Sequence, residues 1–243
     1  MPDILLEVCV DDALGLAAAI QGGADRIELC AALSVGGLTP SPGLLEHAAR
    51  TGVPCCCMIR PRPGDFVYGA QDVAVMKADI RAARAQGLTG VVLGASLADG
   101  RLDTALLADL IAEAQGLELT LHRAVDLCPD AEKAVEQAIA LGFHRILTSG
   151  GALKATDGIP RLQAMFQAAK AALVIMPGSG ISVDTLGLLS QLPLTEIHAS
   201  CARPLPSGGQ ALAFGFQTGA EKRSDSATVA ALKAALRARD QDR

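Results

Sequence analysis

Residues 117–150 read LELTLHRAVDLCPDAEKAVEQAIALGFHRILTSG, an apolar-rich run, a helical stretch and a second apolar-rich run. The runs at 117–123 and 144–150 predict strands, and the stretch at 130–141 predicts a helix that ends at Gly142. A strand, a helix and a strand in this order indicate two parallel strands joined by a helical crossover.

The same order repeats along the whole chain. Further strands are expected at 4–10, 26–30, 54–60, 90–94, 172–180 and 194–200, and further helices at 11–23, 41–51, 71–86, 103–115, 159–171, 182–191 and 225–239. Eight units match the (β/α)8 TIM barrel, whose typical length is about 250 residues. A six-stranded doubly wound sheet would leave two units unplaced. No Gly-, Ser- or Pro-rich linker divides the chain, so we expect one α/β barrel domain over 1–243.

The composition excludes several classes of protein. Half of the residues are hydrophobic and 19% are charged, which favours a large packed core over disorder. The net charge of −5 and the six aromatic residues, one Tyr and five Phe, argue against a nucleic-acid partner. No apolar run reaches the roughly 18 residues of a membrane span. The opening MPDILLEVCV carries acids where a signal peptide is positively charged. We therefore expect a cytoplasmic protein with no membrane partner.

The chain contains seven cysteines, an odd number. A cytoplasmic protein keeps its thiols reduced, so a disulfide framework is not expected. No CxxC pair occurs and no Cys/His spacing matches a structural zinc site. Most of these cysteines are expected to serve as small core hydrophobes.

The alternation within the predicted strands places ionisable residues inside the barrel. Barrel strands point side chains alternately toward the helices and toward the lumen. If the most apolar parity faces the helices, Cys9 and Cys30 point inward together with Glu7, Glu28, Arg60, His122, Glu196 and His198. Any one of these can be a satisfied core polar group. So many charges on one face require an ion network, a polar ligand or both.

The loops after the strands add polar residues at the C-terminal face, where barrel active sites lie. Arg62 and Asp65 follow the third strand, and Arg123 and Asp126 follow the fifth. Ser149 ends the sixth, and Gly178, Ser179 and Gly180 follow the seventh. Gly-rich turns bind anions through backbone N–H groups. The alternative for the last three residues is a tight turn that requires glycine.

Several stretches together resemble the CutC family of copper homeostasis proteins. They are ADRIELCAALSVGGLTPS (24–41), IRPRPGDFVY (59–68), LHRAVDLC (121–128), RILTSG (145–150), PGSGI (177–181) and EIHAS (196–200). The resemblance implies a cytosolic (β/α)8 protein, often a homodimer, that is linked to copper handling and described as binding Cu(I). Residues 201–222, CARPLPSGGQALAFGFQTGAEK, depart from the family pattern. The resemblance to the family implies no role for Cys55, Cys56 and Cys57.

Cu(I) binding is the first functional hypothesis. Cu(I) is soft and prefers thiolate or thioether ligands. Cys9 and Cys30 end neighbouring strands with the same parity, so they are the predicted metal pair. Cys128 and Cys201 are expected at the same mouth of the barrel, and His122 and His198 are candidates to assist.

The second hypothesis is an isomerase, epimerase or lyase acting on a small anionic or sugar-like substrate. The predicted catalytic residues are Glu7, Glu28, Arg60, His122 and His198, the carboxylates as acid and base, the histidines as proton carriers and the arginine as an anion clamp. The predicted substrate-binding residues are Arg62, Asp65, Arg123, Asp126, Ser149, Gly178, Ser179 and Gly180, the two aspartates orienting arginines or holding their loops. A purely structural adaptor fits poorly, because packing alone requires no interior charges.

Overall fold

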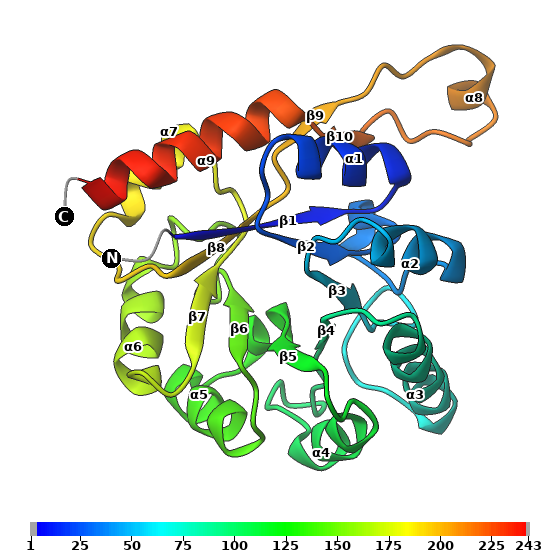
Figure 1. Ribbon diagram of the computed structural model, residues 1–243. Coiled ribbons are helices and arrows are strands. Elements are labelled where there is room, and N and C mark those ends of the chain that lie inside the picture. Colours follow the sequence, from blue (N-terminus) through cyan, green and yellow to red (C-terminus); the bar gives the residue numbers. More distant parts are fainter. Residues whose placement is uncertain (1–3, 242–243) are drawn as a thin grey trace.

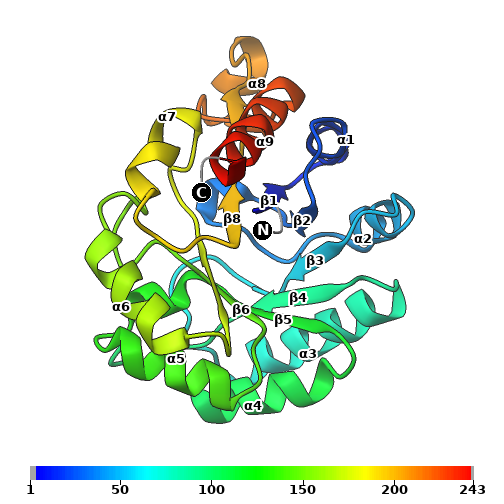
Figure 2. The same cartoon turned by 60° about the vertical axis from the view of Figure 1, so that its left-hand side comes forward.

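The computed structural model describes residues 4–241 and confirms the (β/α)8 barrel. Eight parallel strands follow the order β7-β6-β5-β4-β3-β2-β1-β8, so consecutive strands from β1 to β7 pair with one another and β8 pairs with β1. β7 and β8 form the two ends of this hydrogen-bonded order. Helices lie around the outside of the strands (Figure 1, Figure 2). The strands are β1 (Leu5–Val10), β2 (Arg26–Leu29), β3 (Cys55–Met58), β4 (Gly90–Leu93), β5 (Glu118–Leu121), β6 (Arg145–Thr148), β7 (Val174–Pro177) and β8 (Glu196–Ala199).

The helices follow the predicted order with one shortened member. They are α1 (Ala13–Gln21), α2 (Pro42–Ala49), α3 (Ala70–Ala85), α4 (Thr104–Glu113), α5 (Ala131–Ala140), α6 (Ile159–Ala169), α7 (Val183–Leu186) and α9 (Ser226–Gln241), with short 3-10 turns at Leu33–Val35, Arg123–Leu127 and Gly187–Leu189. The Ser41 hydroxyl caps α2 by accepting from Leu44 N, and Pro42 stands in its first turn, as predicted. The helix expected at 182–191 is only α7 followed by a 3-10 turn.

The strand parity agrees with the expectation. Leu6, Val8, Ile27 and Leu29 belong to the large core between strands and helices. A separate small cluster holds the lumen side chains Cys30, Cys56, Met58 and Val92. The strands themselves are shorter than the apolar runs, because the last residues of each run leave the sheet. His122, for example, caps the 3-10 turn that follows β5.

Residues 202–224 form an excursion that the sequence patterns did not predict. A short antiparallel hairpin, β9 (Ala202–Pro204) with β10 (Lys222–Ser224), carries the helix α8 (Gly209–Ala213), which extends away from the barrel (Figure 1). Phe214 and Phe216 near its tip are exposed. Residues 1–3 and 242–243 of the expected single domain lie outside the described residues. Within residues 4–241, no helix has the length and apolar character needed to cross a bilayer.

Candidate functional site

A cavity of about 360 Å³ opens at the carboxyl ends of the strands. It contains many of the predicted residues, which come from β1, β2, β8 and the segments after β3, β5 and β7. These are Cys9, Glu28, Arg60, His122, Arg123, Ser179, Gly180 and His198. Glu7, Cys30, Arg62, Asp65, Asp126, Ser149 and Gly178 are not among the lining residues.

His198 lies between two carboxylates at the floor of this cavity. Its Nδ1 is 2.8 Å from Glu7 Oε1, and its Nε2 is 3.8 Å from Glu28 Oε2. Strand register explains the first contact, since Glu7 stands opposite His198 on the neighbouring strand. Burial opposes protonation of His198, but Glu28, Cys9 and Glu7 outweigh it and raise the pKa of His198 well above its ordinary value. These neighbours therefore favour the protonated ring.

Cys9 completes a compact group of three side chains. One ligand atom each from Cys9, Glu28 and His198 lies within 4.8 Å of the other two, and all three residues are buried. Cys9 stands opposite Glu28 in the pairing of β1 with β2. Cys30 is outside this group, and its Sγ is 3.5 Å from Glu28 Oε2. Burial and the nearby Glu28 raise the pKa of the Cys30 thiol well above its ordinary value.

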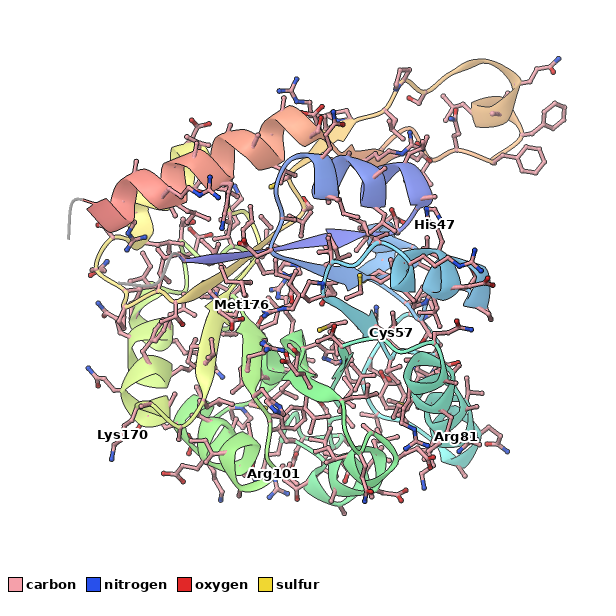
Figure 3. All side chains as sticks on the ribbon, in the orientation of Figure 1. His47, Cys57, Arg81, Arg101, Lys170 and Met176 are labelled. Carbon is pink, nitrogen blue, oxygen red and sulfur yellow. The ribbon has the colours of Figure 1, made fainter. Side chains whose placement is uncertain are left out.

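Below the cavity, Glu7 begins a chain of buried ion pairs. Arg26 Nε is 2.5 Å from Glu7 Oε2, and the same guanidinium contacts Glu196 and, at 3.3 Å, the sulfur of Met176, labelled in Figure 3. Arg145 is 3.2 Å from Glu196 and 2.6 Å from Glu118. Burial opposes ionisation of Glu7, yet bonds from His198 and Arg26 lower its pKa from 4.5 to about 2.

Sequence reasoning missed Arg26 and Arg145, although Arg26 shares the inward parity of Glu28. Glu7 belongs to the ion network rather than to the cavity wall, and it contacts Nδ1 of His198.

His122 lines the cavity and has an unpartnered ring nitrogen. Its Nδ1 accepts a hydrogen bond from Ala124 N at 3.2 Å, and its ring centroid is 4.8 Å from that of Phe66. Burial and the charge of Arg60 lower the pKa of His122 to about 3. Because Nδ1 acts as an acceptor on a neutral ring, the proton is on Nε2. That atom is buried and has no hydrogen-bond partner among residues 4–241.

Glu28, which also lines the cavity, has an unpartnered carboxylate oxygen. Burial raises the pKa of this carboxyl, and the repulsion of Glu7 adds to the effect while His198 opposes it. Its Oε1 is buried without a hydrogen-bond partner in the described part of the chain. Buried polar atoms are normally satisfied, so Glu28 Oε1 and His122 Nε2 together indicate a place for a polar ligand.

Arg60 holds loops through its two terminal nitrogens, whereas its Nε is buried without a hydrogen-bond partner among residues 4–241. Its guanidinium donates to the carbonyl oxygens of Val35, Gly37 and Gly64 and lies over the ring of Phe66 at 5.0 Å. Among the terminal nitrogens, Nη1 and Nη2 are both engaged by these backbone atoms. The residue shapes the cavity wall and contributes its positive charge.

Arg62 and Asp65 form a partly exposed loop cluster away from the cavity. Arg62 bonds Asp65 and Asp72 at 2.9 and 3.1 Å, and its guanidinium lies 5.4 Å from the ring of Tyr68. The hydrogen bond that Arg62 donates to Asp65 raises the pKa of Arg62 and lowers the pKa of Asp65. Their contacts fit loop stabilisation, the alternative held open for Asp65.

Asp126 fills an anion-binding turn with its own carboxylate. It accepts hydrogen bonds from Thr148 Oγ1, Ser149 Oγ and the N–H groups of Ser149 and Gly151, and it pairs with Arg123 Nε at 2.8 Å. Ser149 Oγ also accepts from Arg123 at 2.7 Å. Burial opposes ionisation, but the bonds from Thr148 and Arg123 outweigh it and lower the pKa of Asp126. Asp126 and Ser149 therefore position Arg123, which lines the cavity.

Glycines beside the two histidines leave room for their rings. A Cβ on Gly178 would lie 3.3 Å from the Cβ and Cδ2 of His198 and 2.5 Å from a methyl of Leu147. A Cβ on Gly94, which follows β4, would lie 2.5 Å from His122 Cε1 and Nδ1. Close packing thus explains both glycines, and Gly94 was not identified from the sequence.

Gly94→Ala is expected to displace His122 and to lower the free energy of unfolding by about 1–3 kcal/mol, because the added Cβ would lie 2.5 Å from two atoms of the buried ring. Thermal unfolding and the imidazole NMR resonances measure the two effects. Gly43→Ala on α2 is the matched control, since a Cβ there meets nothing within 4 Å. Equal stability of Gly94→Ala and wild type, with unshifted His122 resonances, would contradict this packing role.

Comparison with known proteins decides the family. The model of the CutC family matches residues 4–203, which is most of the chain. The chain belongs to the CutC family. A CutC family protein of Sinorhizobium medicae is 54% identical over 97% of this chain and 97% of its own length. The human copper homeostasis protein cutC homolog is 44% identical over 84% of this chain and 76% of its own length.

A solved CutC structure supports the barrel independently. The CutC protein of Streptococcus agalactiae superposes with a TM-score of 0.77 at 32% identity, covering 81% of this chain and 98% of that protein. The family match ends at residue 203, where the excursion at 202–224 begins. The excursion thus lies almost wholly outside the part of the CutC family that its model describes.

Proposed function

We propose that the cavity binds Cu(I), with the Cys9 thiolate and the His198 imidazole as ligands, in the copper homeostasis for which the human relative is named. The metal would replace the proton on His198 Nε2, while Glu7 holds Nδ1. The supporting observation is the approach of Cys9, His198 and Glu28 to within 4.8 Å of one another. Thiolate and imidazole suit Cu(I), whereas a carboxylate suits harder ions. Glu7 would orient the His198 ring, as carboxylates commonly do for metal-binding histidines.

The predicted Cys9–Cys30 pair differs from this ligand set in one residue. Cys30 packs with Cys56, Met58 and Val92, and forming its thiolate is opposed by burial and by Glu28. Met58, whose thioether is also a soft donor, lines the cavity. The experiment must therefore compare the contributions of Cys30 and His198 to Cu(I) affinity.

The test is Cu(I) affinity measured without oxygen against a competing chelator. Cys9→Ser and His198→Asn are each expected to weaken binding by about 100-fold or more, which is about 2.7 kcal/mol. Cys30→Ser is expected to change it by less than about tenfold. Cys128→Ser, at a buried cysteine outside the cavity lining, is the matched control. Unchanged affinity in Cys9→Ser would overturn the proposal, and loss in Cys30→Ser alone would restore Cys30 to the ligand set.

A second candidate function is an enzyme of the isomerase, epimerase or lyase type acting on a small anionic or sugar-like substrate. Three unpartnered buried atoms of lining residues, Glu28 Oε1, Arg60 Nε and His122 Nε2, favour it, because a metal ion held by Cys9 and His198 would leave the His122 donor unsatisfied. Three cationic side chains, Arg60, Arg123 and His198, line the cavity against one carboxylate, Glu28. Titration calorimetry with 2-phosphoglycolate tests for the anion site, and absence of binding would contradict it.

The family membership also supports a homodimer in the cytoplasm. Sedimentation equilibrium of the purified chain and fractionation of cells test these two properties, and a monomer or a membrane-associated protein would contradict them.

A further inference from the structure

The His122 side chain is a fixed, neutral hydrogen-bond donor. Its Nδ1 is held by Ala124 N, its ring lies against Phe66, and Gly94 makes space for it. With Nδ1 as the acceptor, Nε2 carries the proton and has no acceptor among the described residues. A neutral imidazole N–H directed at a substrate carbonyl stabilises the negative charge that develops on that oxygen during enolisation.

Glu28 is a buried carboxylate with one free oxygen. Its Oε2 is engaged by Cys30 Sγ at 3.5 Å and His198 Nε2 at 3.8 Å, which leaves Oε1 without a partner. Glu28 is on β2 and His122 follows β5, so the base and the donor reach the cavity from different strands.

A third set of groups can hold an anionic substituent. Ser179 and Gly180 line the cavity, and no hydrogen bond described within residues 4–241 engages their N–H groups. Ser179 Oγ donates to Leu153 O at 2.7 Å, so the backbone rather than the hydroxyl is the available donor. Arg123, positioned by Asp126 and Ser149, lines the same cavity.

We propose that this cavity enolises a small α-hydroxycarbonyl compound bearing a phosphate or carboxylate, with Glu28 as the base and His122 Nε2–H as the donor to the carbonyl oxygen. This inference rests on the second candidate function and specifies its reaction. Neither a metal ion nor a redox partner is required for the step.

The step balances within the substrate and Glu28. Glu28 Oε1 takes the proton from the carbon next to the carbonyl, and the C–H electron pair forms a carbon–carbon double bond. The carbonyl π pair moves to the oxygen, whose negative charge His122 Nε2–H stabilises. Return of the proton to the same carbon introduces solvent hydrogen, and return to the neighbouring carbon, with a proton shift between the two oxygens, gives the isomeric carbonyl compound.

The test is exchange of carbon-bound hydrogen for deuterium in D2O, followed by proton NMR. Dihydroxyacetone phosphate and hydroxypyruvate are the probes, one for each anionic group. Wild-type protein is expected to accelerate exchange over buffer with at least one of them. Glu28→Gln is expected to reduce the protein-dependent rate by about 100-fold or more, and His122→Phe by about tenfold or more.

Glu46→Gln and His47→Phe are the matched controls, because both residues are exposed on α2 (His47 is labelled in Figure 3). They receive the same types of substitution and the same purification. A contaminating isomerase would give equal exchange rates in all five proteins, and that result would overturn the proposal. The thermal unfolding temperature of each variant separates a lost group from a lost fold.

Calorimetric titration of the same two probes distinguishes failure of the enolisation proposal from failure of the anionic-ligand function. A probe that binds without protein-dependent exchange overturns enolisation and leaves the anionic-ligand function standing. Failure of both probes to bind overturns both. Nitrogen NMR of wild type adds a check that needs no variant, since an imidazolium at His122 at pH 7 would remove the proposed neutral donor.

Discussion

Replacing Glu7 with glutamine is expected to lower the free energy of unfolding by about 3–5 kcal/mol, because the buried Arg26 and His198 side chains would both lose the charge of their fully buried carboxylate partner. Arg26 would keep its contact with Glu196. For a chain of this length, 1 kcal/mol corresponds to a shift of about 2–4 °C in the unfolding temperature. Thermal and denaturant unfolding at pH 7 measure the loss.

Glu118→Gln is the matched comparison within the same ion network. Its side chain is 40% exposed, and its partner Arg145 keeps contacts with Glu196 and Thr120. We expect a loss of about 1 kcal/mol or less there. A similar loss in both variants would show that Glu7 is not the central carboxylate of the network.

The pH dependence of the Glu7 effect has a definite sign. The folded-state pKa, about 2, is below the ordinary value of 4.5, so ionised Glu7 stabilises the fold fully above pH 4.5. This contribution is lost as the pH falls from about 4.5 through 2. The difference in unfolding free energy between wild type and Glu7→Gln should therefore shrink across that interval, and a difference that grows would contradict the assignment.

Asp126→Ala is expected to cost about 3 kcal/mol and to create an empty anion site. The carboxylate accepts from Thr148, Ser149 and Gly151 and pairs with Arg123, and each buried donor left without an acceptor costs about 1–3 kcal/mol. Solvent access at Arg123, which is 40% exposed, keeps the total below the simple sum. Chemical denaturation at pH 7 measures the change.

Added formate should restore part of this stability, since a ligand that binds only the folded state stabilises it by mass action. We expect 0.1 M formate (roughly a hundredfold excess over a millimolar dissociation constant) to raise the unfolding temperature of Asp126→Ala more than that of wild type. Formate should have no selective effect on Asp65→Ala, because Asp65 is on the exposed loop with Arg62. Equal responses in all three proteins would show that no anion site forms.

Much of the site could be predicted from the sequence, because the face on which a strand residue lies depends only on the alternation within that strand. Cys9, Glu28, His122 and His198 were placed in the lumen from the apolar alternation of their own strands, and all four line the cavity. Arg60 and Glu7 were also placed inside, yet their hydrogen bonds go to loop carbonyls and to the ion network. Long side chains reach several acceptors, and parity does not select among them.

The amino-acid order alone determined the eight repeating units, the barrel and the face on which each strand carries its charges, since burial against helices imposes the apolar period on every strand. The folded chain alone decided the partners. Glu7 meets His198 across 191 positions, Asp126 occupies the turn after β6, and Cys9 lies with His198 and Glu28 rather than in a cysteine pair. These pairings depend on strand register and side-chain reach, which are fixed only when β8 closes onto β1.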